Sequence, residues 1–138
     1  MNSKSSVTVS FTITSPTMPP ERIVEVLPFT PSKSWREGDT IGNSIIRRKH
    51  NGAVFALPQQ RVDDIEPVVL ELLDKLEPIK GELIRMSATC PMDCEVSCAV
   101  YFDQPPSCNL SAGTIKRLAE LGVALDIDMI HSDLSSDL

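Results

Sequence analysis

Residues 7–14 alternate strictly between apolar and hydroxyl side chains, and no other run constrains the fold as strongly. The apolar positions are Val7, Val9, Phe11 and Ile13, and serine or threonine occupies the positions between them. Successive side chains of a β-strand point to opposite sides, so this pattern predicts a strand with one buried face. Such a strand needs neighbours in a sheet and a layer that covers its apolar side.

Two helices are expected in the first 77 residues, both with boundaries marked by proline. The first should open at Pro19-Pro20-Glu21, because proline suits a first helical turn, and stop at Pro28 and Pro31. Apolar side chains at helical spacing predict a longer helix over residues 62–77, capped by an aspartate near its start. Pro78 should end or kink that helix, with residues 79–86 adding a turn or two.

The C-terminal third is expected to contain a strand, a helix and another strand. Residues 94–102 alternate in polarity and predict the first of these strands. Ser111 should cap the following helix, and Gly122 should end it in the left-handed conformation that glycine tolerates best. Alternation returns over residues 125–129 and predicts the last strand.

A β-hairpin is predicted where Asn51 and Gly52 separate two strand-like runs, residues 44–50 and 53–57. A tight turn of the primed type requires positive φ at both central residues, which the Asn-Gly pair supplies readily. Pro58 should end the second of these strands.

The predicted element order is β-α-β-β-α-β-α-β, which indicates a single α+β domain. Its first six elements match a ferredoxin-like split βαβ pattern, and an α-β unit is appended to them. We expect this domain to span residues 7–130, after a disordered N-terminus at 1–6 and before a polar acidic tail at 131–138.

The charge of the chain, formally −6, is distributed unevenly. Residues 1–61 hold eight Lys or Arg against four acids, whereas residues 62–138 hold five against fifteen, with no base after Arg117. Free nucleic acid is an unfavourable partner for such a chain, and an acidic C-terminal face suits a basic protein. The alternative is that the two halves fold together and much of the asymmetry cancels.

The location expected from sequence is the cytoplasm. Apolar runs are only a few residues long, too short to span a bilayer. The first six residues are polar and lack the apolar centre of a secretion signal.

Four cysteines, at positions 90, 94, 98 and 108, have a spacing that superficially resembles a metal site. They lack the paired C-x2-C arrangement of common zinc sites. Cys94 and Cys98 share the apolar parity of their predicted strand, so the favoured interpretation is core cysteines in a reducing compartment. No metal and no cofactor are expected.

Catalytic residues are not expected either. The glycines are scattered and form no phosphate loop, and no serine lies in a nucleophile elbow. His50 and His131 have no sequence neighbour that would orient either imidazole as a base. The sequence therefore favours a non-enzymatic protein.

Two charged pairs are candidates for partner binding. Asp126 and Asp128 should point to the same side of the last strand, where they could bind a cation or an arginine-rich partner, or simply protect a sheet edge from aggregation. Arg47 and Lys49 should share one face of the predicted hairpin, where they could contact nucleic acid or an acidic partner, and the favoured interpretation is a solvated hairpin.

The single tryptophan, Trp35, lies in the polar, proline-containing segment 28–39 beside Arg36. One interpretation is a structural lid whose ring folds back on the sheet. The other is an exposed interface anchor, because tryptophan and arginine side by side are typical of binding hot spots. The lid is the favoured interpretation.

The order of these features resembles the bacterial domain-of-unknown-function family 4279. The segments that carry the resemblance are Pro20-Glu21-Arg22-Ile23, Trp35-Arg36-Glu37-Gly38-Asp39, Leu72-Leu73-Asp74-Lys75-Leu76-Glu77-Pro78, Leu118-Ala119-Glu120-Leu121-Gly122 and Leu125-Asp126-Ile127-Asp128. Phe55 departs from it, because the family tends to have tryptophan there. The resemblance implies a small intracellular bacterial or phage protein without established enzymatic activity, in some cases an immunity protein that neutralises a toxin.

These observations lead to one main hypothesis and one alternative. The main hypothesis is a protein-binding domain, an immunity or inhibitor protein that occludes a basic partner through its acidic face. The alternative is a small-ligand or metal-binding domain that uses the Trp35 segment and the basic hairpin. An exposed edge strand would also allow a homodimer.

Overall fold

The computed structural model describes residues 4–27 and 29–132, which form one sheet and a layer of helices. The strands are β1 (Ser5–Ser15), β2 (Lys33–Trp35), β3 (Asn51–Ala56), β4 (Gln60–Arg61), β5 (Asp93–Phe102) and β6 (Ala124–His131). The helices are α1 (Pro20–Val26), α2 (Glu66–Leu76), α3 (Lys80–Thr89) and α4 (Ala112–Leu121), with the 3-10 turn η1 (Glu77–Ile79) between α2 and α3.

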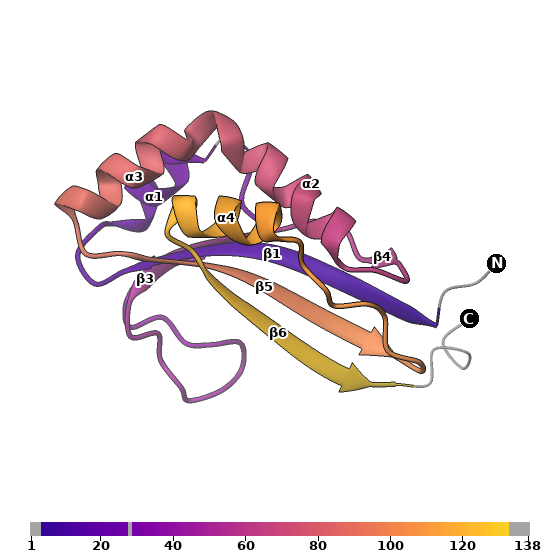
Figure 1. Cartoon of the computed structure of the whole chain (residues 1–138). Coiled ribbons are helices and arrows are strands. Elements are labelled where there is room, and N and C mark those ends of the chain that lie inside the picture. Colours follow the sequence, from indigo (N-terminus) through magenta and orange to yellow (C-terminus); the bar gives the residue numbers. More distant parts are fainter. Residues whose placement is uncertain (1–3, 28, 133–138) are drawn as a thin grey trace.

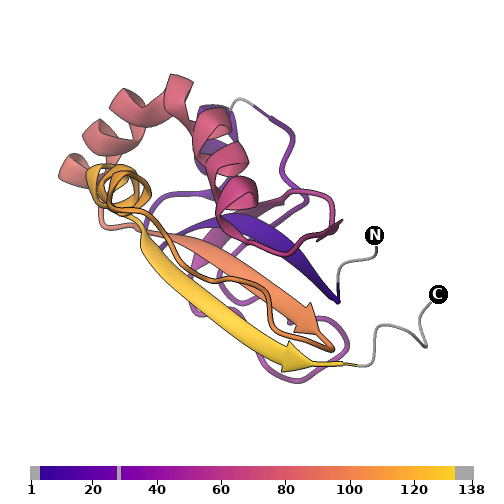
Figure 2. The ribbon, with the colours of Figure 1, turned by 45° about the vertical axis from the view of Figure 1, so that its right-hand side comes forward.

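The strands lie side by side in the order β2-β3-β1-β5-β6, and β4 pairs with the first part of β1. All neighbours are antiparallel except β5 and β6, which are parallel and joined through α4. All four helices lie on the same face of the sheet, which we call the covered face (Figures 1 and 2). The opposite face is the open face, and β6 forms one edge of the sheet.

The hydrophobic core lies between the covered face and the helices. The apolar residues of β1 point into it, and α2 supplies the largest helical share of its fully buried side chains. These core residues are Val7, Val9, Phe11 and Ile13 from β1, and Val69, Leu72, Leu73 and Leu76 from α2. The predicted alternation of residues 7–14 is therefore confirmed, because the hydroxyl residues between them lie on the open face.

The first strand begins earlier than the sequence indicates. Ser5 and Ser6 belong to β1 and are buried, although the sequence assigned them to a disordered segment. The reason is pairing. The Val62 N–H donates to the Ser5 carbonyl over 3.1 Å, and Ser6 lies opposite Arg61 of β4. Residues 1–3 of that segment lie outside the described residues.

The helix boundaries follow the prolines closely. The first helix begins at Pro20, within the Pro19-Pro20-Glu21 run that predicted its start, and ends at Val26, while Pro28 lies outside the described residues. The long helix begins at Glu66, later than predicted. The Glu66 N–H donates a hydrogen bond to the Asp64 carboxylate over 3.1 Å. The kink at Pro78 is confirmed as η1, and α3 then continues to Thr89, beyond the turn or two expected.

The end signals of the last helix are confirmed. The Ser111 hydroxyl accepts a hydrogen bond from the Thr114 N–H over 3.3 Å, and Gly122 has φ = 70°. The strand that follows is longer than predicted and includes His131, which the sequence assigned to the tail. Residues 133–138 of that tail lie outside the described residues.

The predicted hairpin at Asn51 and Gly52 is wrong. Both residues lie in β3, opposite Ser15 and Thr14 of β1, and residues 44–50 form a loop without a strand. The side chain of Asn51 forms two hydrogen bonds: it accepts one from the Glu37 N–H and donates one to the Met18 carbonyl, each over 2.8 Å.

Gly52 is required for close packing and not for a turn. Its φ is not positive, whereas Gly38, Gly42 and Gly122 have positive φ. The indole of Trp35 lies directly over it, so a Cβ at this position would approach the indole Cζ2 to 2.4 Å. Asn51 and Gly52 are thus accounted for by three tertiary contacts, with Glu37, Met18 and Trp35, and not by a turn.

The α+β fold class is confirmed, but the ferredoxin-like pattern is not. The sheet has six strands where five were predicted, since β2 and β4 are additions and the run 44–50 is not a strand. The strand order therefore differs from the one that the predicted hairpin implied. Among the described helices, none combines the length and apolar character needed to cross a membrane.

Candidate functional site

Trp35 is the last residue of β2 and lies on the open face, not in the loop that the sequence suggested. Only 9% of its surface is exposed, because Gly52 lies beneath the ring and Arg48 above it. The guanidinium carbon of Arg48 is 4.0 Å from the ring centroid, which is cation–π geometry. The ring and the guanidinium together hold the following loop against the sheet.

The 36–50 loop is tied together by its own cations. The Arg36 guanidinium forms an ion pair with Glu21 of α1. Arg47 donates to the Gly38 carbonyl over 2.9 Å, and Thr40 and Arg47 form an isolated antiparallel bridge. Arg47 and Lys49 therefore lie in a loop, not on one face of a strand as predicted. Lys49 is exposed to solvent.

Two hollows flank Trp35. One has a volume of about 450 Å³ and is lined by Glu21, Arg36 and Asp39 together with the indole. The other has a volume of about 250 Å³ and lies beneath the 36–50 loop. The larger hollow falls within the usual volume range of small-molecule sites.

The tip of the 36–50 loop carries isoleucines that the sequence did not identify as surface residues. Ile45 is 96% exposed and Ile46 62%, and the Ile41 N–H donates to the Ile46 carbonyl over 2.8 Å. The sequence pattern placed both in the first strand of the predicted hairpin, and the structure places them in a loop. The available signal was an Ile-Ile pair within a segment whose other residues, apart from Ile41 and the glycines, are polar.

Asp126 and Asp128 lie on β6 and are exposed on the open face, on one side of the strand as predicted. Two more acids share that face on β5. Ser97 lies opposite Asp126 in the sheet, so the two side chains face the same side. Glu95 and Asp93 are two and four positions from Ser97 on β5, so they face that side as well. These four residues form what we call the acidic stripe: Asp93, Glu95, Asp126 and Asp128.

The acidic stripe is not neutralised by neighbouring bases. Within residues 4–27 and 29–132, no ion pair includes any of its four carboxylates. The Ser97 hydroxyl donates to the Glu95 carboxylate over 2.8 Å, which is a neutral contact. The stripe therefore carries four exposed negative charges on two adjacent strands.

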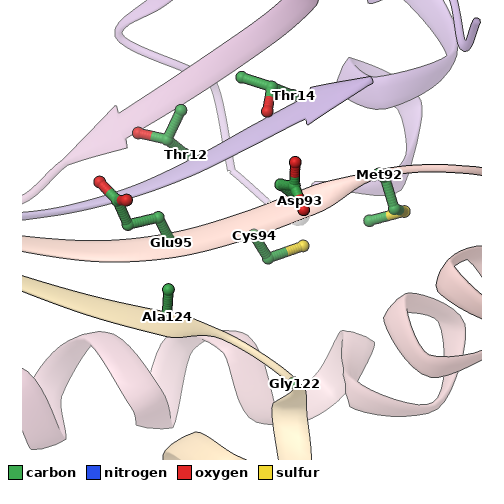
Figure 3. A pocket seen from close by; sticks show the side chains of 8 residues that line it. All are labelled: Thr12, Thr14, Met92, Asp93, Cys94, Glu95, Gly122 and Ala124. Carbon is green, nitrogen blue, oxygen red and sulfur yellow. The ribbon is translucent and has the colours of Figure 1, made fainter. Parts of the chain in front are cut away.

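A shallow hollow of about 430 Å³ adjoins the start of the acidic stripe. Figure 3 shows its polar lining, with Thr12 and Thr14 from β1 beside Asp93 and Glu95 from β5. These groups are hydroxyls and carboxylates, so the hollow suits a cationic or hydrogen-bond-donating group more than an anion.

Positive and negative charges occupy opposite sides of the open face. Lys33 shares the face of Trp35 on β2, and Lys49 follows in the adjoining loop. The acidic stripe lies across the sheet on β5 and β6. The open face therefore has lysines near β2 and carboxylates on β5 and β6.

The cysteines lie where a core interpretation places them. Cys94 and Cys98 lie on the covered face, opposite Ile13 and Val9, and Cys98 is buried. Burial raises the pKa of both thiols to about 11, with smaller effects from Asp93 on Cys94 and from Cys108 and Asp126 on Cys98. A thiol with this pKa is almost entirely protonated at neutral pH and is a poor nucleophile.

The remaining chemistry-bearing groups are dispersed. His131 packs edge-on against the ring of Phe102, with centroids 5.4 Å apart, and His50 lies in the 36–50 loop. In the part of the chain that the structure describes, no three His, Cys, Asp or Glu side chains are placed to hold a metal ion.

Comparison with known proteins gives one match. A family model described as "Domain of unknown function (DUF4279)" matches residues 5–132, from the start of β1 to just beyond β6. No curated protein and no solved structure matches the chain. The resemblance noted in the sequence is confirmed by this match.

Proposed function

The chain belongs to the DUF4279 family, and we propose that it is a non-enzymatic intracellular domain that binds another protein. The binding surface in this proposal is the acidic stripe, and the partner presents a basic surface. The domain acts by occlusion, as an inhibitor or immunity protein does when it covers the functional cleft of its target.

The observation that carries this proposal is the arrangement of Asp126 and Asp128. Both are exposed, both face the same side of an edge strand, and neither has an ion-pair partner among the described residues. With Asp93 and Glu95 beside them, they concentrate negative potential on one side of the sheet. Such a surface steers a basic partner and fixes its orientation.

The state of the loop cations favours this proposal over a small-ligand site at Trp35. Arg36 is paired with Glu21, Arg47 with the Gly38 carbonyl, and Arg48 stacks on the indole. These contacts hold the loop in place, so an anionic ligand would have to compete for cations that are already engaged. The acidic stripe imposes no such competition.

The proposal predicts that neutralising two acids of the stripe releases the partner. We expect the double variant Asp126→Asn/Asp128→Asn to recover at least about tenfold less partner than the wild type from its native host, since losing two interfacial charges typically costs well over 1 kcal/mol. Recovery by the wild type should fall as salt is raised, because salt screens exposed charges.

A matched control removes the same charge from the helical side. Glu25 and Glu71 are exposed on α1 and α2, so Glu25→Gln/Glu71→Gln should recover the partner as the wild type does. Recovery of no stoichiometric protein by the wild type, or equal recovery by both double variants, would contradict the proposal.

A further inference from the structure

The outer edge of β6 presents unpaired backbone groups. The Ser132 N–H donates to the Phe102 carbonyl of β5 over 2.7 Å. Backbone direction alternates along a strand, so Asp126, Asp128 and Ile130 also direct their backbone groups toward β5. The groups of the alternate residues point away from the sheet: Leu125, Ile127, Met129 and His131. Among the described residues, no backbone hydrogen bond reaches them.

The side chains of β6 divide this edge into two chemically different faces. Asp126 and Asp128 lie on the open face, while Leu125, Ile127 and Met129 lie on the covered side. Leu125 near the start of β6 is 38% exposed and Met129 near its end is 45% exposed. Met129 is partly covered by Cys108, whose Sγ lies 4.0 Å from the Met129 sulfur. A strand that pairs here meets carboxylates on one side and apolar side chains on the other.

A second copy of the chain is a poor occupant of this edge. In an antiparallel pair, residues directly opposite each other face the same side of the sheet. In the registers with the greatest overlap of two β6 strands, Asp128 would lie opposite Asp126 or Asp128 of the other copy. Like charges directly opposite destabilise such a pair.

We propose that the partner adds an extended strand to the outer edge of β6, with basic side chains opposite Asp126 and Asp128 and apolar side chains on the covered side. This inference rests on the proposed function and specifies the partner: an extended segment in which basic and apolar residues alternate. Backbone hydrogen bonds then supply affinity, and the two faces of the strand set register and specificity.

The test uses a synthetic probe, an octapeptide in which valine and lysine alternate, capped at both ends. Isothermal titration calorimetry on the full chain measures its dissociation constant. A scrambled peptide of the same composition controls for net charge. We expect the scrambled peptide to bind at least about tenfold more weakly, because it cannot place lysines and valines on separate faces.

Two variants at one position isolate the backbone contribution. Met129→Pro removes the backbone N–H of residue 129, which points away from the sheet, and leaves the acids intact. Proline is tolerated at such outward-facing positions of edge strands. Met129→Val keeps that N–H. Because both variants lose the methionine side chain, they are compared with each other. We expect Met129→Pro to bind the alternating peptide at least about fivefold more weakly than Met129→Val, the effect of losing a hydrogen bond.

The outcomes separate this inference from the proposed function. Equal binding by Met129→Pro and Met129→Val, with weak binding by Asp126→Asn/Asp128→Asn, overturns strand addition and leaves the acidic stripe as a docking surface. Full binding by Asp126→Asn/Asp128→Asn overturns the charge complementarity on which both depend. Undetectable binding of the alternating peptide to the wild type also overturns strand addition.

Two further controls cover folding and self-association. Thermal unfolding shows whether Met129→Pro folds. If it does not fold, the wild type is titrated instead with the alternating peptide methylated on every backbone nitrogen, which cannot donate backbone hydrogen bonds. Binding equal to that of the unmethylated peptide overturns the inference. A wild-type dimer that Met129→Pro converts to monomer would assign the edge to a second copy and likewise overturn it.

Discussion

Replacing Ile13 with alanine is expected to lower the free energy of unfolding by about 2–5 kcal/mol. Ile13 has no exposed surface and lies on β1 between Ala53 of β3 and Cys94 of β5. Removing most of its side chain at the centre of the sheet loses burial and leaves a cavity that rigid neighbours on both sides cannot fill. Urea denaturation followed by circular dichroism measures the change.

Ile45 provides a matched control of the same residue type. It is 96% exposed at the tip of the 36–50 loop, so Ile45→Ala should change the free energy of unfolding by no more than about 0.5 kcal/mol. Comparable losses in the two variants would show that residue 45 packs against the fold, and that the separation of core and surface described above is wrong.

The second large effect is expected from Gly52→Ala, which should cost about 1–3 kcal/mol of stability. The added Cβ would lie 2.4 Å from Cζ2 and 2.5 Å from Cε2 of Trp35, closer than atoms can approach. The indole must then lift from β3 and disturb its contact with Arg48. Since the chain has one tryptophan, its fluorescence emission reports this displacement directly.

Gly81 is the control for a glycine-to-alanine change without crowding. It lies in α3, and a Cβ there would meet no atom within 4 Å. Gly81→Ala should therefore leave the emission unchanged and stabilise the protein by about 0.5–1 kcal/mol, the difference in helix propensity. An unshifted emission spectrum and wild-type stability for Gly52→Ala would refute the close packing of Trp35.

Local signals in the sequence were sufficient for much of the fold. The alternation in β1, the Ser111 cap, the left-handed Gly122 and the break at Pro78 each involve residues within a few positions of one another. Propensity and periodicity describe such short-range interactions well, so these elements were predicted correctly apart from their ends.

The hairpin was mispredicted because its signal came from long-range contacts. Asn51 and Gly52 look like a turn, but Asn51 bonds to Met18 and Glu37, and Gly52 accommodates Trp35. These partners are distant in sequence, and no local pattern distinguishes a glycine that relieves crowding from a glycine that permits positive φ.

The candidate site was predictable only where its residues are close in sequence. Asp126 and Asp128 are two positions apart on one strand, so alternation alone placed them on a common face. Asp93 and Glu95 join them only through the pairing of β5 with β6, which depends on the crossover through α4. Sheet register across a crossover is a tertiary property, and the sequence pattern does not encode it locally.

The free outer edge of β6 is the central claim of this account, and residue-resolved amide hydrogen exchange of the isolated protein tests it most directly. The N–H groups of Asp126, Asp128 and Ile130 bond to β5 and should exchange slowly, whereas those of Leu125, Ile127 and Met129 should exchange rapidly. This alternation is the predicted result. Uniform protection along β6 would show that the edge is already paired, and uniformly rapid exchange would show that β6 does not pair stably with β5; either result would contradict the account.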